Sequence, residues 1–359
     1  MILYIDKRPV ANRSFDVLQE KVAGCFAIKE SGKGAEMVNF AILATGGIAA
    51  KMSHAVSGLP EVHKYAVASR SLERAENFAA EWGYEKAYGS YEEMLRDPKV
   101  ELVYVASPHS HHYEHAKMCI EAGKHVLVEK AFTVNAKQAK ELIALAKEKQ
   151  VLLVEAMWTR FMPARFMVDE LIAQGTIGEI YSVTANLGYD IKKKGRLIKP
   201  ELAGGALLDV GVYPIQFALM AVHSPVRTIS SDAVLSDAGV DVTNSVTLTF
   251  ENGAMAVLHS SMMNLTDREG VIYGENGRIC VHNINNCEGI TVYDKAGNMI
   301  KEIAVPEQIN GYEYEVLACI KAIKEGRTEC EEMPHEETLR GMEILDTIRK
   351  QWGMVYPCE

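Results

Sequence analysis

Short apolar runs alternate with amphipathic segments between residues 38 and 157. The runs are rich in aliphatic side chains and have the length of buried parallel strands. The predicted strands are 39–44, 64–69, 102–106, 125–129 and 151–156. The predicted helices are 48–57, 72–82, 90–96, 110–122 and 135–149. Strands and helices in this order form a doubly wound parallel sheet, so we expect an α/β domain over residues 37–157.

After Trp158 the pattern changes to one amphipathic helix at 163–174, followed by a succession of strands. The predicted strands are 179–187, 227–236, 243–250, 254–261, 270–274, 278–283 and 289–293. Asn-Gly pairs at 252–253 and 276–277 join consecutive strands as hairpins. We expect an α+β domain with a largely antiparallel sheet over residues 158–334, which includes a helix near 312–325. A C-terminal helix and tail occupy residues 335–359.

Residues 1–36 show no clear periodicity, and the first convincing strand begins directly after Met37. Residues 33–36 could be encoded by a purine-rich stretch that resembles a bacterial ribosome-binding site. Our hypothesis is that translation naturally starts at Met37 and that residues 1–36 are an extension from a mis-assigned start. N-terminal sequencing of protein from its natural host tests this, and a mature protein that begins at Met1 would disprove it.

The 359 residues carry a net charge of −10, which argues against a nucleic-acid partner or an anionic membrane surface. No apolar run reaches the length of a bilayer-spanning helix, and the first residues do not resemble a secretory signal. The seven cysteines are scattered and form no Cys-x-x-Cys pair, which is typical of reduced thiols in a cytosol. We therefore expect a cytoplasmic protein of two domains with no membrane partner.

The apolar run His125–Val128 ends in two adjacent charges, Glu129 and Lys130. Open α/β sheets bind ligands at the carboxyl ends of their strands, so this pair is predicted to reach a cleft. Lys130 would there hold a substrate oxygen or exchange a proton with it. The alternative is a strand that ends in solvent, with an exposed ion pair of little energetic weight.

The turn after the first strand, Ala44–Ala49, partly matches the dinucleotide fingerprint Gly-x-Gly-x-x-Gly/Ala. Ala44 replaces the first glycine, while Gly46 and Ala49 match. Backbone N–H groups and the positive end of the helix dipole can receive a pyrophosphate there, although glycines also occur in such turns without a ligand. The residues expected to form this contact are Thr45, Gly46, Gly47, Ile48 and Ala49.

The second strand ends in Ser69 and Arg70, where a protein that prefers NAD usually places an acidic residue. A hydroxyl and a guanidinium suit the 2′-phosphate of NADP, so we expect NADP as the cofactor, with NAD as the alternative. An arginine in a solvated loop would look the same in the sequence.

A histidine-rich segment begins at Ser107, after the third of these strands. Histidines at this density suggest a metal site, but they fall on different faces of a helix start and no cysteine or carboxylate joins them. We therefore predict no metal. Pro108 and His109, with Ser107, are expected to shape the nicotinamide side of the cleft, and His112 is expected to be a hydrogen-bonding brace.

In the second domain the segment Gly204–Pro214 is the densest functional candidate. Asp209 and Tyr213 are four residues apart and share one face if the segment is helical. A tyrosine that faces Lys130 across a cleft would donate or accept a proton at a carbonyl, with its pKa lowered by the nearby cation. The alternative is a helix start with a capping aspartate and a packed tyrosine.

Trp158, Arg160 and Phe161 lie where the two predicted domains meet. Aromatic side chains there would line a substrate slot or would equally belong to an interdomain core. The nearby cations of Lys192–Lys194 and Arg196 are interpreted as a solvated loop, with phosphate binding as the alternative.

These residues resemble the glucose–fructose oxidoreductase / inositol dehydrogenase / MocA family from Val38 to the last helix. The most specific signs are the Glu-Lys pair at 129–130, where the family usually has Glu-Lys-Pro, and the glycine-rich segment 204–213. Residues 157–161 and Tyr213 are similar to the branch of dimeric dihydrodiol dehydrogenase and NADP-dependent D-xylose 1-dehydrogenase.

The resemblance implies an N-terminal Rossmann domain and a C-terminal domain whose open sheet often forms a dimer interface. It implies Lys130 and Tyr213 as the catalytic pair, with Asp209 beside them. Ala131 stands in place of the family's proline, which removes a rigid turn that helps to aim the lysine. The expected cofactor contacts are those of the first turn together with Ser69, Arg70, Ser107, Pro108, His109, His112, Glu129, Lys130, Trp158 and Arg160; the expected substrate contacts are Trp158, Phe161, Asp209 and Tyr213.

We therefore expect an NADP-preferring oxidoreductase that transfers a hydride between nicotinamide and a hydroxyl-bearing carbon of a sugar or cyclic polyol. D-xylose or another aldose and a trans-dihydrodiol are the substrate types that the branch suggests, and a homodimer is the expected assembly. One alternative is an enzyme that oxidises sugars or glycosides at carbon 3 with tightly held, internally recycled NAD. The other is a non-catalytic dinucleotide-binding regulator.

Overall fold

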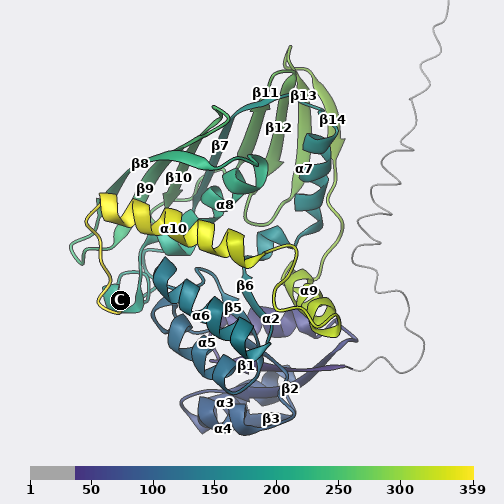
Figure 1. Cartoon of the computed structure of the whole chain (residues 1–359), viewed down its shortest axis with the longest axis vertical. Helices are drawn as coiled ribbons and strands as arrows, with labels where there is room; N and C mark the ends of the chain where they lie inside the picture. The colour runs from purple at the N-terminus through teal and green to yellow at the C-terminus, as the bar shows by residue number, and fades with distance from the viewer. Residues whose placement is uncertain (1–36) are drawn as a thin grey trace, which may run out of the picture. The chain divides into compact units, whose positions relative to one another are not determined.

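The first half of the described chain forms a six-stranded parallel sheet with the strand order β3-β2-β1-β4-β5-β6 (Figure 1). The computed structural model describes residues 37–359, so the hypothesis about residues 1–36 lies outside the described residues. The strands are β1 (Val38–Leu43), β2 (Val62–Ala68), β3 (Lys86–Tyr88), β4 (Leu102–Val105), β5 (His125–Glu129) and β6 (Leu153–Ala156). The prediction of a doubly wound Rossmann sheet is confirmed.

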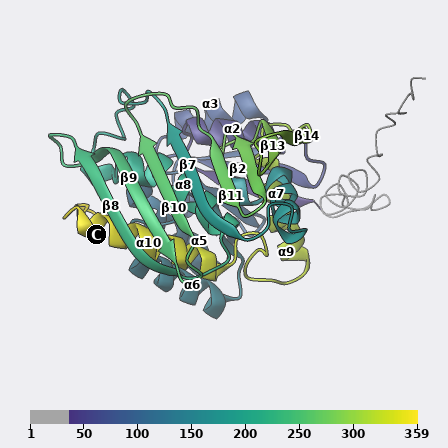
Figure 2. The same cartoon turned by 90° about the horizontal axis from the view of Figure 1, so that it is seen from above.

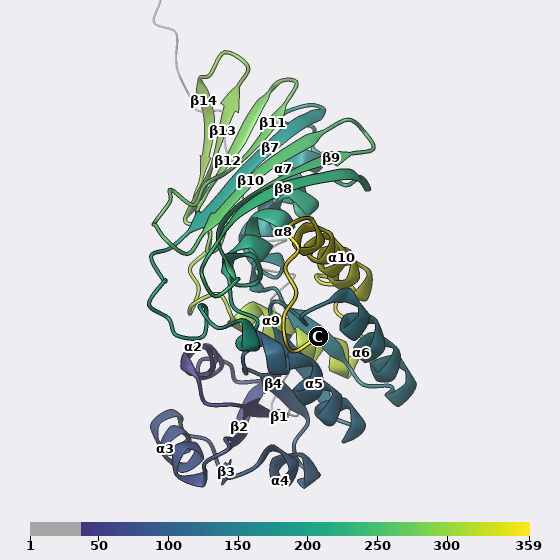
Figure 3. The same cartoon turned by 90° about the vertical axis from the view of Figure 1, so that its left-hand side faces the viewer.

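The helices of this domain cover both faces of the sheet, with α5 and α6 on one face and α2 on the other (Figure 3). Their bounds are α2 (Gly47–Val56), α3 (Leu72–Trp82), α4 (Tyr91–Arg96), α5 (His112–Glu121) and α6 (Ala136–Lys149). Local sequence explains their ends: Ser71 accepts a hydrogen bond from the Arg74 N–H at the start of α3, and Gly83 ends that helix with a φ of 75°.

The second half forms an eight-stranded sheet with the order β14-β13-β12-β11-β7-β10-β9-β8. Only β7 and β10 pair in parallel; the other pairs are antiparallel, and both Asn-Gly pairs form hairpins as predicted. The strands are β7 (Ile180–Gly188), β8 (Val226–Leu235), β9 (Asp241–Phe250), β10 (Met255–Ser261), β11 (Gly270–Gly274), β12 (Gly277–His282), β13 (Gly289–Asp294) and β14 (Met299–Ile303).

Helices α7 (Pro163–Ala173) and α8 (Val212–Ala221) pack against one face of this sheet, and the opposite face carries no helix of the described chain (Figure 2). Side chains on the uncovered face include Met255, Val257 and Tyr273, which are exposed. The largely antiparallel open sheet is therefore present as predicted.

The last two helices connect the two halves of the described chain. Helix α9 (Glu313–Lys324) contacts α2 and β5 of the parallel-sheet domain. Helix α10 (His335–Gln351) lies between α6 on one side and α8 with β8 on the other. Because segments distant in sequence meet around β5, residues of α8 and α9 can reach the end of that strand.

The local predictions differ from the structure at a few places. The short strands β3 and β14 were missed, since neither carries a buried apolar run. The predicted helix 110–122 is present as α5, and a 3₁₀ turn at His109–His111 precedes it. The helical stretch Pro200–Ala221 is long and apolar enough to span a bilayer, contrary to expectation, but 94% of its apolar window is buried inside the protein.

Candidate active site

The site is built around Lys130, the residue that follows β5, which lies between β4 and the edge strand β6 of the parallel sheet. Its ammonium nitrogen donates a hydrogen bond to the backbone oxygen of Asp209 at 2.5 Å and lies 3.5 Å from the carboxylate Oδ1 of the same residue. The same nitrogen lies 5.0 Å from the centroid of the Tyr213 ring. The structure thus brings together the three residues that were predicted to be catalytic. The Lys130–Ala131 peptide bond is cis.

Asp209 and Tyr213 are placed by a π-helical turn, Leu207–Gly211, that leads into α8. The Val212 N–H bonds back to the Leu207 oxygen, the wide spacing of a π-helix. Pro214 lies five residues after Asp209 and has no N–H, so it cannot donate the corresponding bond to the Asp209 carbonyl. That carbonyl accepts from Lys130 instead.

The carboxylate of Asp241 also stabilises this π-helical turn. Asp241, fully buried on β9, accepts hydrogen bonds from the Leu207 N–H at 2.8 Å and from the Asn244 side chain. Gly205 has a φ of 108°, and a Cβ at that position would collide with the Asp241 carboxylate. The sequence reasoning did not include Asp241, because nothing near it in the chain shows that it caps the turn.

The Asp209 carboxylate is shared by two cations. The Arg196 guanidinium donates a hydrogen bond to Oδ1 of Asp209 at 2.7 Å, and the ammonium nitrogen of Lys130 lies 3.5 Å from the same oxygen. Burial alone would raise the pKa of Asp209, but the charges of Lys130 and Arg196 outweigh it and hold the pKa below its usual range. The interpretation of Arg196 as part of a solvated loop was therefore wrong, since it belongs to the site.

Tyr213 is buried, and its hydroxyl accepts a hydrogen bond from the Trp158 indole N–H at 3.1 Å. Burial raises the pKa of Tyr213 well above its ordinary value, and the negative charge of Glu129 raises it further. The expectation of a lowered tyrosine pKa was wrong, because loss of water outweighs the nearby ammonium. Tyr213 is thus a protonated hydroxyl at neutral pH.

The side chains of Trp158, Arg160 and Phe161 have different surroundings in the structure. Trp158 stacks on Tyr312 from the start of α9, with ring centroids 4.3 Å apart and an angle of 5° between the planes. Phe161 has no exposed surface, and its expected contact with a substrate stays a prediction.

Arg160 is buried as well, and its guanidinium is held by two partners outside the cleft. It donates to Gln216 on α8 at 2.9 Å and to Glu337 on α10 at 2.5 Å. These bonds tie the segment after β6 to both helices, and the expected cofactor contact of Arg160 stays a prediction.

The turn between β1 and α2 leaves open space in which a pyrophosphate could bind. Helix α2 starts at Gly47, no acidic residue lies in its first turn, and Gly46 and Gly47 are exposed. A Cβ on Gly47 would meet nothing within 4 Å, and on Gly46 only the Ala106 oxygen at 4.0 Å, so this space is left open by the chain itself. Ala44 has a φ of 80°, the conformation that the fingerprint's first glycine adopts without strain.

The remaining predicted residues of the first turn are Thr45 and Ile48, which are half-buried, and Ala49, which is fully buried behind the turn. At the end of β2, Ser69 is buried and Arg70 is exposed. The positive charge of Arg70 acts on Tyr91 and His115, which places the guanidinium between the β2 end and the start of α5. An exposed guanidinium at this position fits a phosphate on the adenosine ribose.

Two buried histidines lie after β4, His109 in a 3₁₀ turn and His112 at the start of α5. His112 is fully buried, and its ring nitrogens face the Ser107 and Ala131 backbone oxygens at 2.8 Å each. His109 faces the Ala203 oxygen at 3.1 Å. Burial lowers the pKa of His112 to about 4 and that of His109 to about 3. Within residues 37–359, no cluster of His, Cys, Asp or Glu is arranged to hold a metal ion.

Pro108 precedes the 3₁₀ turn in an extended conformation and is half-buried. Glu129 lies behind Lys130 rather than at the surface, and its carboxylate accepts a hydrogen bond from the Tyr104 hydroxyl. Burial raises the pKa of Glu129, although the Lys130 charge opposes the shift. The expected cofactor contact of Glu129 stays a prediction.

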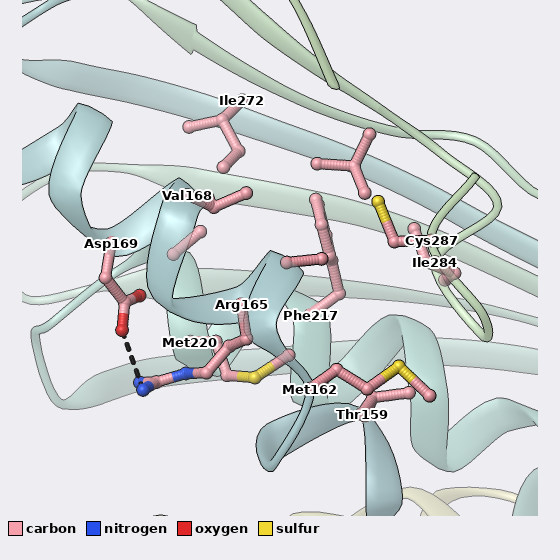
Figure 4. Close-up of a pocket in the computed structure, with 13 residues that line it drawn as sticks. Thr159, Met162, Arg165, Val168, Asp169, Phe217, Met220, Ile272, Ile284 and Cys287 are labelled. Atoms are coloured by element: carbon pink, nitrogen blue, oxygen red, sulfur yellow. Dashed lines mark ion pairs between the residues drawn. The ribbon is translucent and has the colours of Figure 1, made fainter. Parts of the chain in front are cut away.

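A separate small cavity of about 40 Å³ lies between α7, α8 and the eight-stranded sheet (Figure 4). Its lining is apolar except for Thr159, the thiol of Cys287 and the Arg165–Asp169 ion pair, whose charged atoms are 2.7 Å apart. It has room for about one water molecule. None of the residues around Lys130 lines it, so it is no part of the candidate active site.

The comparisons with known proteins agree with this geometry. The oxidoreductase family with an NAD-binding Rossmann fold (GFO_IDH_MocA) matches residues 38–157, and the GFO/IDH/MocA C-terminal domain matches residues 167–280. The trans-1,2-dihydrobenzene-1,2-diol dehydrogenase of Xenopus tropicalis is 34% identical, over 88% of this chain and 98% of that protein. The D-xylose 1-dehydrogenase (NADP(+)) of Hypocrea jecorina is 31% identical, over 89% of this chain and 93% of that protein.

Among solved structures, a 3-ketoreductase from Actinomadura kijaniata in complex with NADP and TDP-benzene superimposes with a TM-score of 0.79. It is 27% identical, and the match covers 88% of this chain and 98% of that one. With both domains matched, the chain belongs to the glucose–fructose oxidoreductase / inositol dehydrogenase / MocA family of oxidoreductases.

Proposed function

We propose that the protein is an NADP-preferring dehydrogenase that oxidises a hydroxyl-bearing carbon of a sugar or cyclic polyol, or reduces the corresponding carbonyl. The observation that carries this proposal is the cluster of Lys130, Arg196, Asp209 and Tyr213 at the carboxyl end of β5. The curated relatives named above include dehydrogenases of a dihydrodiol and of D-xylose, and both their names and the cluster support the same reaction class.

The cofactor, when bound, supplies the hydride acceptor or donor. The open first turn and the exposed Arg70 are the residues that would hold its pyrophosphate and 2′-phosphate. The exposed Arg70 and the absence of an acidic side chain at positions 69 and 70 support NADP over NAD.

Three groups of the cluster have distinct parts in the proposed reaction. The Lys130 ammonium is held by the Asp209 carbonyl, which aims it and lets it stabilise negative charge on the reacting oxygen. The ionised Asp209 can accept hydrogen bonds from neighbouring hydroxyl groups of a polyol. Tyr213 exchanges the proton of the reacting hydroxyl, and Trp158 fixes the tyrosine oxygen.

The test is cofactor reduction, followed at the nicotinamide absorbance, over a panel of aldoses, inositols and cyclic diols with NADP and NAD in parallel. We expect turnover that is faster with NADP, and a Lys130→Met variant that binds NADP but loses most of kcat. Unchanged turnover by this variant excludes the mechanism. A cofactor that survives dialysis and is recycled without exchange points to the sugar 3-oxidising reaction instead.

We also propose that two copies of the chain associate through the uncovered face of the eight-stranded sheet, in a cytoplasmic enzyme. Exposed apolar side chains there, such as Val257 and Met255 on β10, support this assembly, because water-facing strands usually alternate with polar residues. Light scattering of the purified protein tests it: a Val257→Glu variant should dissociate to a monomer, and a monomeric wild-type protein would rule out this interface.

A further inference from the structure

The carbonyl that holds the Lys130 ammonium belongs to Asp209, in the middle of the π-helical turn Leu207–Gly211. Turns of this kind are rare in proteins and are frequent at functional sites. Because the turn is short, the location of the Asp209 carbonyl depends on what fixes the residues around it. Leu207, the first residue of the turn, donates a backbone hydrogen bond at 2.8 Å to the carboxylate of Asp241, which has no exposed surface.

Asp241 is itself anchored in the eight-stranded sheet, where it is the first residue of β9. The Asn244 amide donates to the same carboxylate oxygen, Oδ2, at 2.8 Å. Asn244 in turn accepts a hydrogen bond at 2.8 Å from the hydroxyl of Ser260 on β10, its partner in the β9–β10 ladder. All three side chains are buried, so water does not compete for these bonds. Two paired strands are thus joined to the Leu207 N–H by hydrogen bonds.

Glycines let the turn lie directly on this hydrogen-bonded network. A Cβ on Gly205 would collide with the Asp241 carboxylate, and a Cβ on Gly211 would lie 2.9 Å from the Ser260 hydroxyl oxygen. The missing side chains therefore allow close contact just before the turn and at its last residue. Of these contacts, the one between Asp241 and Leu207 is a directed hydrogen bond to the turn itself, so it fixes both distance and orientation.

A displacement of Leu207 would be passed on to the reacting groups. The Asp209 carbonyl lies two residues further along the same turn and is 2.5 Å from the Lys130 nitrogen. A catalytic group that is misplaced by about 1 Å can cost about 100-fold in rate. Asp241 is fully buried, so any effect of its side chain on the reaction passes through the turn.

We propose that Asp241 is a positioning residue, which fixes the turn 207–211 through the Leu207 N–H and thereby aims the Lys130 ammonium at the reacting oxygen. Catalytic groups keep a productive geometry only when a second layer of hydrogen bonds supports them, and Asp241, Asn244 and Ser260 form such a layer here. The effect on the reaction rests on the function proposed above, whereas the placement of Lys130 by Asp241 does not.

Kinetics of two Asp241 variants test the positioning role. Asp241→Ala removes the acceptor and should lower kcat about tenfold, the scale of losing one hydrogen bond to a charged group. The KM for NADP should stay within about twofold, because the predicted cofactor turn lies in the other domain. Asp241→Asn keeps an oxygen for the Leu207 N–H, and the Asn244 amide can turn its own oxygen toward the new amide, so kcat should stay within about threefold.

The contrast between the two variants decides the outcome. Asp241→Ala with the kcat of wild type would overturn the proposal, and so would an Asp241→Asn variant as slow as Asp241→Ala. If Asp241→Ala does not fold, Asn244→Ala carries the same test. It leaves the carboxylate in place but removes its link to Ser260, so kcat should fall about threefold, and an unchanged kcat would overturn the proposal.

The matched control is Leu248→Ala, which trims a fully buried apolar side chain of the same strand. It should lower the melting temperature but leave kcat unchanged well below that temperature. A kcat that falls as far in the control as in Asp241→Ala would show a general loss of stability and would overturn the positioning role.

Crystal structures of the wild-type protein and of the variants without substrate test the placement directly. In Asp241→Ala, or in Asn244→Ala if the former does not fold, the distance from the Lys130 nitrogen to the Asp209 carbonyl oxygen should exceed about 3.5 Å, beyond hydrogen-bond range. An unchanged distance would overturn the proposal. Lack of turnover by the wild-type protein on every substrate would count against the proposed function, while these structures would still decide whether Asp241 places Lys130.

Discussion

Replacement of Asp209 by asparagine separates the charge of this side chain from its shape. The amide keeps the size of the carboxylate and leaves the backbone oxygen that holds Lys130 in place. It removes the only negative charge that Lys130 and Arg196 share at Oδ1. The variant therefore leaves two cations facing each other in a site where the Asp209 side chain is 8% exposed.

The burial of the ion pairs sets the size of the expected loss of stability. Removing one partner of a buried ion pair costs about 3–5 kcal/mol. The Arg196 side chain is 39% exposed and can turn into water, and Lys130 keeps its bond to the carbonyl. We therefore expect Asp209→Asn to lower the free energy of unfolding by about 2 kcal/mol at pH 7, less than the full penalty. We expect kcat to fall about 100-fold, the scale of losing one charged group at the reacting oxygen.

Urea unfolding at pH 7 and at lower pH provides the assay, with Asp237→Asn at an exposed position as the control. The pKa of Asp209 is lowered in the folded protein, so its contribution is present at neutral pH and is lost as the pH falls below about 4, the ordinary value of aspartate. The difference in the free energy of unfolding between wild type and Asp209→Asn should therefore become smaller as the pH falls. A variant as stable as wild type at pH 7, or a difference independent of pH, would refute the shared ion pair.

Three further predictions follow from other parts of the site. Ala44→Gly should raise the free energy of unfolding, measured with urea, by about 0.5–1 kcal/mol, because alanine is strained at a φ of 80°; an unchanged free energy would show that the turn relaxes. Arg70→Ser should raise the KM for NADP about tenfold or more and leave that for NAD unaltered; equal effects on both would exclude a 2′-phosphate contact. Because burial raises the pKa of Tyr213, oxidation should speed up from neutral toward alkaline pH while carbonyl reduction slows, and Tyr213→Phe should abolish both trends.

Much of the local structure could be predicted from the sequence, because it depends on neighbouring residues. The apolar run before Glu129 and the glycine-bounded segment 270–274 were predicted with the observed bounds. The Asn-Gly hairpins and the turn after β1 depend on backbone conformations that few residue types adopt. The proximity of Lys130, Asp209 and Tyr213 was also predicted, from their positions at element ends and from the family resemblance; their catalytic roles stay a prediction.

The environment of these residues was decided only by the tertiary structure. Whether Arg196 is solvated or paired depends on where the segment 207–211 comes to lie, and the sequence contains no local sign of it. The hydrogen bonds of Arg160 to α8 and α10 likewise join segments that are distant in the sequence, so only the fold shows them.

The protonation states of the site residues were also decided by the tertiary structure. The sequence shows a tyrosine and a lysine that could meet, and proximity to a cation predicts a lowered tyrosine pKa. The fold surrounds Tyr213 with buried side chains and lowers the local polarity, so the desolvation of the charged form dominates and the pKa rises instead. Sequence by itself determined which elements form and which chemical groups stand at their ends. Only the packing of distant segments decided how much water reaches those groups, and burial sets their charge.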